Sequence, residues 1–129
     1  MNPQDVPRPT DAELAILLVL WQRGPCTVRQ VHEALIEGRP MVYTTVLKLM
    51  QIMTDKGLVR RDESERTHVY EVTRTEEETQ RQLVDHLLDR AFGGSGPRLA
   101  MRALATRRSS PGELAELRQL LDELEEDPA

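Results

Sequence analysis

Four short motifs constrain the fold most strongly, because each marks the start of a helix. A hydroxyl residue stands three positions before Glu or Gln at residues 10–13, 27–30, 75–78 and 110–113. In such a capping box the hydroxyl accepts a hydrogen bond from the third helical N–H, and the Glu or Gln accepts one from the cap N–H. Because an amphipathic apolar stripe follows each motif, we expect a mainly α chain.

Residues 10–56 predict three helices in close succession. The first runs from the first capping box to Gly24, and the second runs from the second box to about Gly38. A third helix over residues 43–56 follows a short connection, and Gly57 is well placed as its C-cap glycine. Two helices joined by so short a turn indicate a helix-turn-helix.

Two β-favouring stretches follow the third helix. Residues 58–61 and 67–72 flank the charged stretch 62–66, and this arrangement predicts a hairpin. A charged hairpin directly after a helix-turn-helix is the layout of a wing. The sequence therefore predicts an N-terminal winged helix-turn-helix domain over residues 10–73.

Residues 74–126 predict a second region built from three amphipathic helices. The glycine-rich joint at residues 93–96 and the last capping box separate them. Isolated helices of this length cannot hide a leucine stripe, so another surface must cover it. Packing onto the N-terminal domain is one alternative, and we favour a homodimer interface with a second copy of the chain. The leucines expected in this dimerisation domain are Leu83, Leu87, Leu88, Leu104, Leu114, Leu117, Leu121 and Leu124.

The two ends of the chain predict little structure of their own. Three prolines within the first nine residues predict a flexible N-terminal arm over residues 1–9, and residues 127–129 form a short tail. The longest apolar run, residues 14–21, is too short to cross a bilayer, and the N-terminus lacks the regions of a signal peptide. We therefore expect a cytoplasmic protein without direct membrane binding.

Patterns typical of catalytic and metal sites are incomplete. The single cysteine, Cys26, excludes an internal disulfide and a multi-cysteine metal site, and we expect it to be a small buried residue. His32 and Glu33 begin a zinc-protease motif, but Ile36 stands where the second histidine is needed. We therefore expect no enzyme activity, no cofactor and no metal.

The charge balance leaves two classes of partner open. A formal net charge of −5 argues against a protein that coats nucleic acid in general, although most of the excess acid falls in residues 74–129. A winged-helix protein-interaction module without sequence-specific DNA binding is therefore an alternative to a DNA-binding protein. Salt separates the two classes, because only DNA binding weakens steeply as salt rises.

The start of the third helix carries chemistry that suits DNA. Tyr43, Thr44, Thr45 and Lys48 combine hydroxyls, an aromatic ring and a cation. Hydroxyls and helix N-terminal N–H groups hold phosphates, while threonine methyl and lysine ammonium groups meet base edges in the major groove. The alternative is that the hydroxyl residues only cap the helix.

The chain resembles the penicillinase and methicillin-resistance repressor family (BlaI/MecI/CopY) from Thr10 to about Leu124. The pieces Tyr-Thr-Thr-Val and Lys-Gly-Leu-Val, at this separation, are fairly specific together. The resemblance is carried by residues 10–14, residues 20–21, residues 42–47, residues 56–59 and the wing ending at residues 69–70.

This resemblance implies a homodimeric transcriptional repressor that binds double-stranded operator DNA containing an inverted repeat. Its target genes would encode a β-lactamase, another resistance determinant or copper transport. Carried onto this sequence, the family's contacts fall on Thr44, Thr45 and Lys48 for bases and nearby phosphates, Tyr43 and Arg29 for the backbone, and Arg61, Arg66 and Thr67 for the wing.

Two departures limit what the resemblance implies. Copper-responsive members carry a C-terminal cysteine cluster, whereas Cys26 is the one cysteine here. Members that respond to β-lactams are inactivated when a membrane sensor metalloprotease cleaves an Asn-Phe bond in the dimerisation region. The matching stretch, residues 99–103, contains no such pair, so the sequence assigns no cleavage site to this candidate partner.

Overall fold

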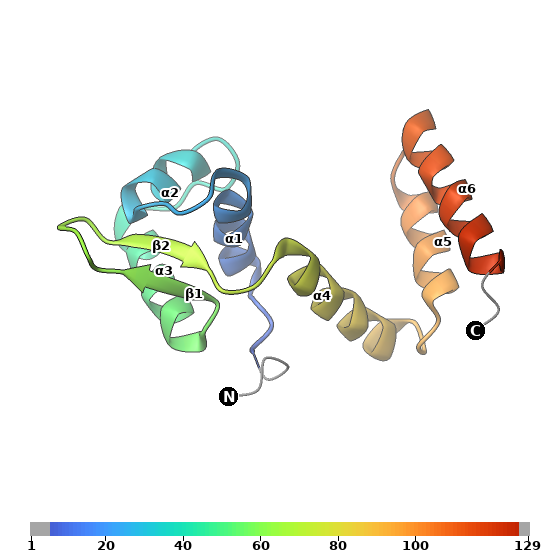
Figure 1. Cartoon of the computed structure of the whole chain (residues 1–129), viewed down its shortest axis with the longest axis horizontal. Helices are drawn as coiled ribbons and strands as arrows, with labels where there is room; N and C mark the ends of the chain where they lie inside the picture. Colours follow the sequence, from blue (N-terminus) through green and yellow to red (C-terminus); the bar gives the residue numbers. More distant parts are fainter. Residues whose placement is uncertain (1–5, 127–129) are drawn as a thin grey trace. The chain divides into compact units, whose positions relative to one another are not determined.

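The computed structural model describes residues 6–126, and these form six helices and one two-stranded antiparallel sheet (Figure 1). The prediction of a mainly helical chain with a single hairpin is confirmed. The elements are α1 (Asp11–Arg23), α2 (Val28–Leu35), α3 (Tyr43–Lys56), β1 (Val59–Asp62), β2 (Val69–Val72), α4 (Glu76–Ala91), α5 (Gly96–Thr106) and α6 (Pro111–Glu126).

All four predicted capping boxes are formed. At each one the cap N–H donates to a Glu or Gln side-chain oxygen, and the third helical N–H donates to the hydroxyl, with N···O distances of 2.8 to 3.2 Å. These bonds satisfy N–H groups that a helix start leaves without partners. They therefore fix the residues at which α1, α2, α4 and α6 begin.

One hydrophobic core organises the N-terminal unit, whose described part is residues 6–84. Each of the first three helices turns one stripe inward, and the hairpin closes the remaining side. The core residues are Ile16, Leu17, Val19, Leu20, Cys26, Val28, Val31, Leu35, Val46, Met50, Met53, Leu58, Val59 and Tyr70. Because α3 buries only one stripe, its opposite face is left to solvent.

The hairpin is short and is fixed to the rest of the unit. Its register pairs Val59 with Val72 and Asp62 with Val69. The strands begin and end within two residues of the predicted stretches. Directly after β1 the chain turns, and the Asp62 carboxylate accepts a hydrogen bond from the Ser64 N–H there. Tyr70 also forms a β-bridge with buried Cys26, through N···O bonds of 2.8 and 3.0 Å. This bridge ties the hairpin to the start of α2.

Residues 1–5 and 127–129 lie outside the described residues, so the expected arm is seen only in residues 6–9. Here Pro9 is buried and Val6 packs against the core. The Val6 carbonyl oxygen accepts a hydrogen bond from Gln82 Nε2 at 2.7 Å. The sequence predicts a flexible arm, whereas the structure shows contacts at residues 6–9. A hydrogen bond to a backbone carbonyl oxygen cannot be anticipated from the pattern of side chains.

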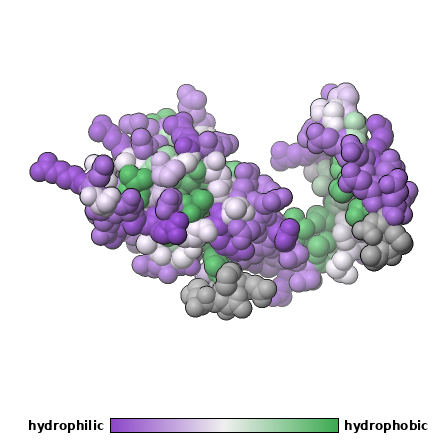
Figure 2. All heavy atoms as spheres, in the orientation of Figure 1, coloured by the Kyte–Doolittle hydropathy of each residue, from purple (hydrophilic) through white to green (hydrophobic). Residues whose placement is uncertain are grey.

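The C-terminal helices bury little of their own surface. The chain divides into two compact units between Val84 and Asp85, inside α4. The sequence predicts the domain boundary between residues 73 and 74. In α5 and α6 no residue is buried, and Figure 2 shows hydrophobic side chains at the surface of this region. None of the helices in the described chain is both long and apolar enough to cross a membrane.

Candidate nucleic-acid interface

Helix α3 begins without a side-chain cap. Its N-cap residue is Val42, in extended backbone with φ −66° and ψ 152°, and no side-chain hydrogen bond caps the first turn. The structure therefore does not support the alternative in which Thr44 and Thr45 serve only as caps. The first N–H groups of α3 lack side-chain partners, and such groups at a helix start bind anions such as phosphate.

The solvent face of α3 carries a line of polar side chains. Thr44, Lys48 and Gln51 are exposed and lie four and three residues apart, so they share one face of the helix. Thr45 is exposed beside them. A depression of about 340 Å³ on this side is lined by Thr44, Thr45, Lys48, Leu49 and Ile52.

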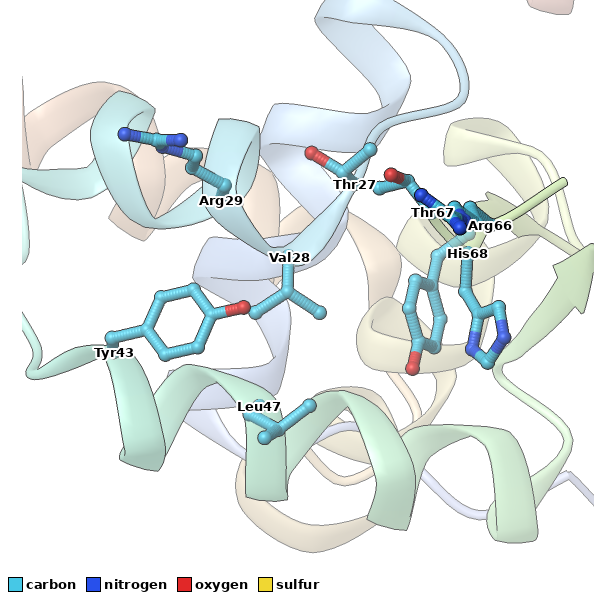
Figure 3. Close-up of a pocket in the computed structure, with 9 residues that line it drawn as sticks. Thr27, Val28, Arg29, Tyr43, Leu47, Arg66, Thr67 and His68 are labelled. Atoms are coloured by element: carbon cyan, nitrogen blue, oxygen red, sulfur yellow. The ribbon is translucent and has the colours of Figure 1, made fainter. Parts of the chain in front are cut away.

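A second hollow, of about 290 Å³, joins three elements next to the start of α3 (Figure 3). Side chains from α2, from α3 and from the tip of the hairpin face it, which brings several predicted contacts together. Its lining residues are Thr27, Val28, Arg29, Tyr43, Leu47, Arg66, Thr67, His68 and Tyr70. The lining of the hollow thus combines apolar side chains, such as Val28 and Leu47, with polar ones.

Tyr43 and Arg29 take different positions at this hollow. The ring of His32 meets the Tyr43 ring edge-on, with centroids 5.8 Å apart, and this contact orients the tyrosine at the start of α3. The Arg29 side chain runs along α2 toward Glu33, with Nε and Oε1 3.4 Å apart (Figure 3). The Arg29 side chain is 82% exposed, so this ion pair contributes little energy to hold it in place.

The two arginines predicted for the wing differ in their surroundings. Arg61 pairs with Glu63, and a hydrogen bond to the Tyr70 hydroxyl, together with that carboxylate, raises the pKa of the Arg61 guanidinium. Arg66 is exposed and takes part in none of the ion pairs formed by residues 6–126. Arg66 is therefore the freer cation of the wing.

Two further residues of this surface were missed by the sequence predictions. Gln51 continues the exposed line of α3 one turn beyond Lys48, and its i+3 spacing from Lys48 was the available indication. His68 lines the hollow beside Thr67. Nothing in the local sequence distinguishes His68 from an ordinary turn residue, because its place depends on how the hairpin packs against α2.

None of the leucines predicted for self-association is fully buried within the chain. Leu121 and Leu124 of α6 are 58% and 63% exposed. Leu87, Leu104 and Leu114 are also exposed, and the remaining members of the predicted set, Leu83, Leu88 and Leu117, are half-buried. A hollow of about 420 Å³ is lined by Leu104 of α5 and by Leu117 and Leu120 of α6, among others.

Comparison with known proteins assigns the chain to a family. The sequence pattern of the penicillinase repressor family matches residues 9–123. The transcriptional regulator BlaI of Mycobacterium tuberculosis is 38% identical over 116 residues, which cover 89% of this chain and 83% of that protein. The predicted family resemblance is confirmed by both comparisons.

Solved structures show the same fold. The solution structure of the DNA-binding domain of the repressor BlaI matches with a TM-score of 0.51 at 22% identity, covering 57% of this chain and 90% of that one. Monomeric Bacillus licheniformis BlaI in complex with the blaP half-operator matches with a TM-score of 0.50 over the same shares, at 22% identity. H. salinarum RosR gives 0.53 at 17% identity, covering 92% of this chain and 96% of that one. The chain belongs to the penicillinase repressor family, and it is a transcriptional repressor with a winged-helix DNA-binding domain and C-terminal helices.

Proposed function

We propose that two copies of this chain bind one operator containing an inverted repeat and thereby block transcription. The observation that carries the proposal is the solvent face of α3, where exposed polar side chains follow an uncapped helix start. A helix with such a face enters the major groove, and its N–H groups contact phosphate there. The relative that was solved with a half-operator has the same fold.

The roles of individual residues follow from their places on this surface. We assign base contacts to Thr44, Thr45 and Lys48, because they occupy the exposed line of α3 and the depression beside it. Arg29 and Tyr43 are assigned to the DNA backbone, because they lie at the hollow beside the helix start.

In the wing, Arg66 and Thr67 contribute phosphate contacts from the other wall of the same hollow. Arg61 is already bonded to Tyr70 and Glu63. It therefore contacts DNA only by exchanging the Glu63 carboxylate for a phosphate, and we assign it the weaker contact.

A homodimer explains the apolar surface of the C-terminal helices. Sixteen-residue α6 presents Leu114, Leu117, Leu121 and Leu124 along one stripe, and none of them is buried within the chain. One small winged helix makes few base contacts, and joining two through these helices raises the effective concentration of the second. A dimer also matches the twofold symmetry of an inverted repeat.

The target genes and the inducing signal are part of the same proposal. Membership of the penicillinase repressor family supports a β-lactamase gene or another resistance or stress gene as the target. Any signal that disrupts the C-terminal helices, such as cleavage by a membrane sensor metalloprotease, separates the two DNA-binding domains. Repression is then relieved, because a single domain binds too weakly to hold the operator.

Selection of binding sites from random duplex DNA, followed by a salt titration on the recovered site, tests this function. We expect an inverted repeat and an affinity that falls steeply with salt, because phosphate contacts release counterions. Lys48→Ala and Thr45→Ala should each weaken binding by roughly 1 to 3 kcal/mol. Arg118→Ala, on α6, is the matched control and should bind as the wild type does. No enrichment by folded, dimeric protein would favour the protein-interaction module instead.

A further inference from the structure

The last two helices of the chain carry opposite charges. Residues 96–110, which include α5, contain four arginines and no Asp or Glu, whereas residues 111–126, which form α6, contain six acidic residues and one arginine. The four arginines are exposed, and none of them takes part in the ion pairs formed by residues 6–126. Protein surfaces usually mix both signs of charge. The separation therefore indicates that each helix meets a complementary surface.

Helices α5 and α6 lie side by side, and an open hollow of about 420 Å³ lies between them (Figure 1). Leu104 is 43% exposed and Leu120 is 50% exposed, so one copy of the chain leaves these leucines in contact with water. The hollow combines apolar side chains with two carboxylates. The residues that line this α5–α6 hollow are Leu104, Ser109, Glu113, Glu116, Leu117 and Leu120.

Another side of α5 carries an exposed methionine beside two arginines. Arg98, Met101, Arg102 and Ala105 lie three or four residues apart and line a shallow hollow of about 290 Å³. Met101 is 62% exposed. Arg102 and Leu104 are two residues apart, so this arginine faces away from the α5–α6 hollow of its own copy. Because methionine and arginine are enriched in protein interfaces, this face is suited to contact another protein surface.

The two surfaces match in chemistry and in spacing. Arg98 and Arg102 are four residues apart, and Glu113 and Glu116 are three residues apart. Residues at either spacing on a helix have Cβ atoms about 5 to 6 Å apart, so two arginines on one helix can meet two carboxylates on another. Met101 then lies against the leucines of the hollow, which removes apolar surface from water.

We infer that, in the homodimer, Arg98, Met101 and Arg102 of each copy dock into the α5–α6 hollow of the other copy. The inference rests on the proposed function and deepens it, because it names the surfaces by which two copies recognise each other. A twofold axis repeats the contact, so each dimer contains it twice. The complementary charges favour pairing with a second copy over pairing with proteins that lack either surface.

Charge reversal tests the pairing of the two surfaces. Arg102→Glu and Glu116→Arg should each weaken the dimer by about tenfold or more, because each variant places like charges opposite one another in both contacts. An equal mixture of the two variants should form a heterodimer with the wild-type affinity, since both of its contacts join opposite charges. Sedimentation velocity measures the dissociation constants, and native mass spectrometry identifies the heterodimer.

Arg107→Glu is the matched control for Arg102→Glu. It makes the same change of charge at an exposed residue outside both hollows, and its dimer should be as stable as that of the wild type. Unchanged dimers in both reversal variants, or a mixture that stays as dissociated as its components, would overturn this inference alone. A wild type that is monomeric at all concentrations would instead contradict the proposed homodimer.

Met101 gives a second test that involves no change of charge. Met101→Ala should weaken the dimer by about tenfold or more, because the interface loses an apolar side chain twice. Met101→Leu keeps the size and apolar character of the side chain and should retain the wild-type affinity. Sedimentation velocity compares the two variants. A Met101→Ala dimer as tight as that of the wild type would place the methionine outside the interface and overturn the inference.

Discussion

Lys56 Nζ lies 2.8 Å from Glu13 Oε2 and 3.1 Å from Oε1, which joins the last turn of α3 to the first turn of α1. Glu13 is 1% exposed, and its carboxylate also accepts the N–H of Thr10 in the capping box. Helix α3 is thus fixed at its C-terminal end by an ion pair, while its N-terminal end has no side-chain cap.

Lys56→Met should destabilise the protein by about 2 to 3 kcal/mol, because it keeps the apolar stem but leaves the buried Glu13 carboxylate without its charged partner. Urea unfolding measures this loss. In the double variant Glu13→Gln with Lys56→Met, the loss should be smaller than the sum of the single losses. A loss below about 0.5 kcal/mol in Lys56→Met would show that the pair contributes little.

The lowered pKa of the Glu13 carboxyl group predicts that the protein loses stability in acid. Burial alone would raise the pKa of Glu13, but hydrogen bonds from Lys56 and Thr10 outweigh it and hold the pKa below its ordinary value of 4.5. The resulting stability is present above that ordinary value and is lost as the pH falls through the folded-state pKa. Hydrogen bonds at the helix caps also lower the pKa of Glu78 and Glu113. The free energy of unfolding of the wild type should therefore fall further below about pH 5.

Urea unfolding of wild type and Glu13→Gln between pH 7 and pH 3 separates the Glu13 contribution. The variant should be less stable at pH 7 and should lose less free energy of unfolding on acidification, so that the two proteins converge. Parallel curves would contradict the assignment of this pH dependence to Glu13.

Gln51→Ala should weaken operator binding by roughly 1 to 3 kcal/mol and relax base preference at one position of each half-site, because a glutamine amide pairs with the edge of adenine. Binding to a panel of single-base operator variants measures both effects. The exposed Gln119 of α6 supplies a matched control, as Gln119→Ala should leave affinity and preference unchanged. Equal weakening on every operator variant would assign Gln51 to the DNA backbone instead.

Paired substitution of Leu117→Asp and Leu121→Asp should separate the homodimer, because carboxylates on the α6 stripe would be desolvated in the interface. Sedimentation velocity measures the change in mass, and the affinity for a paired operator should fall toward that for a single half-site. Gln119→Asp places a carboxylate between them on the same helix and should leave the dimer intact. A double variant that still sediments as a dimer would move the interface elsewhere.

Local chemistry made most of the fold predictable. The capping boxes fixed four helix starts, and Gly57, in left-handed backbone with φ 81°, ends α3 where the sequence indicated. Such features act within a few residues, so they can be read without knowing the tertiary structure. Thr44 and Lys48 of the exposed line on α3 were found for the same reason, whereas Gln51 was missed although helical spacing from Lys48 leads to it.

Contacts between distant parts of the chain were not predictable. The bond from Gln82 to the Val6 carbonyl spans 76 residues and uses a backbone acceptor, which any residue offers equally. The hydrogen bond between Arg61 and Tyr70 depends on the hairpin register, which places these two residues opposite each other and which the sequence left undetermined. Side-chain patterns carry the information for burial, but they do not identify which distant partner satisfies a particular polar group.

Val42 leaves the N-terminus of helix α3 without a side-chain cap. An Asp or Ser at an N-cap typically stabilises a protein by about 1 kcal/mol relative to an apolar residue, and Val42 forgoes that gain. A capping carboxylate would occupy the N–H groups proposed for phosphate and would repel it as well. In the proposed complex, Val42 therefore leaves those N–H groups to phosphate and forgoes the stability that a capping side chain would add.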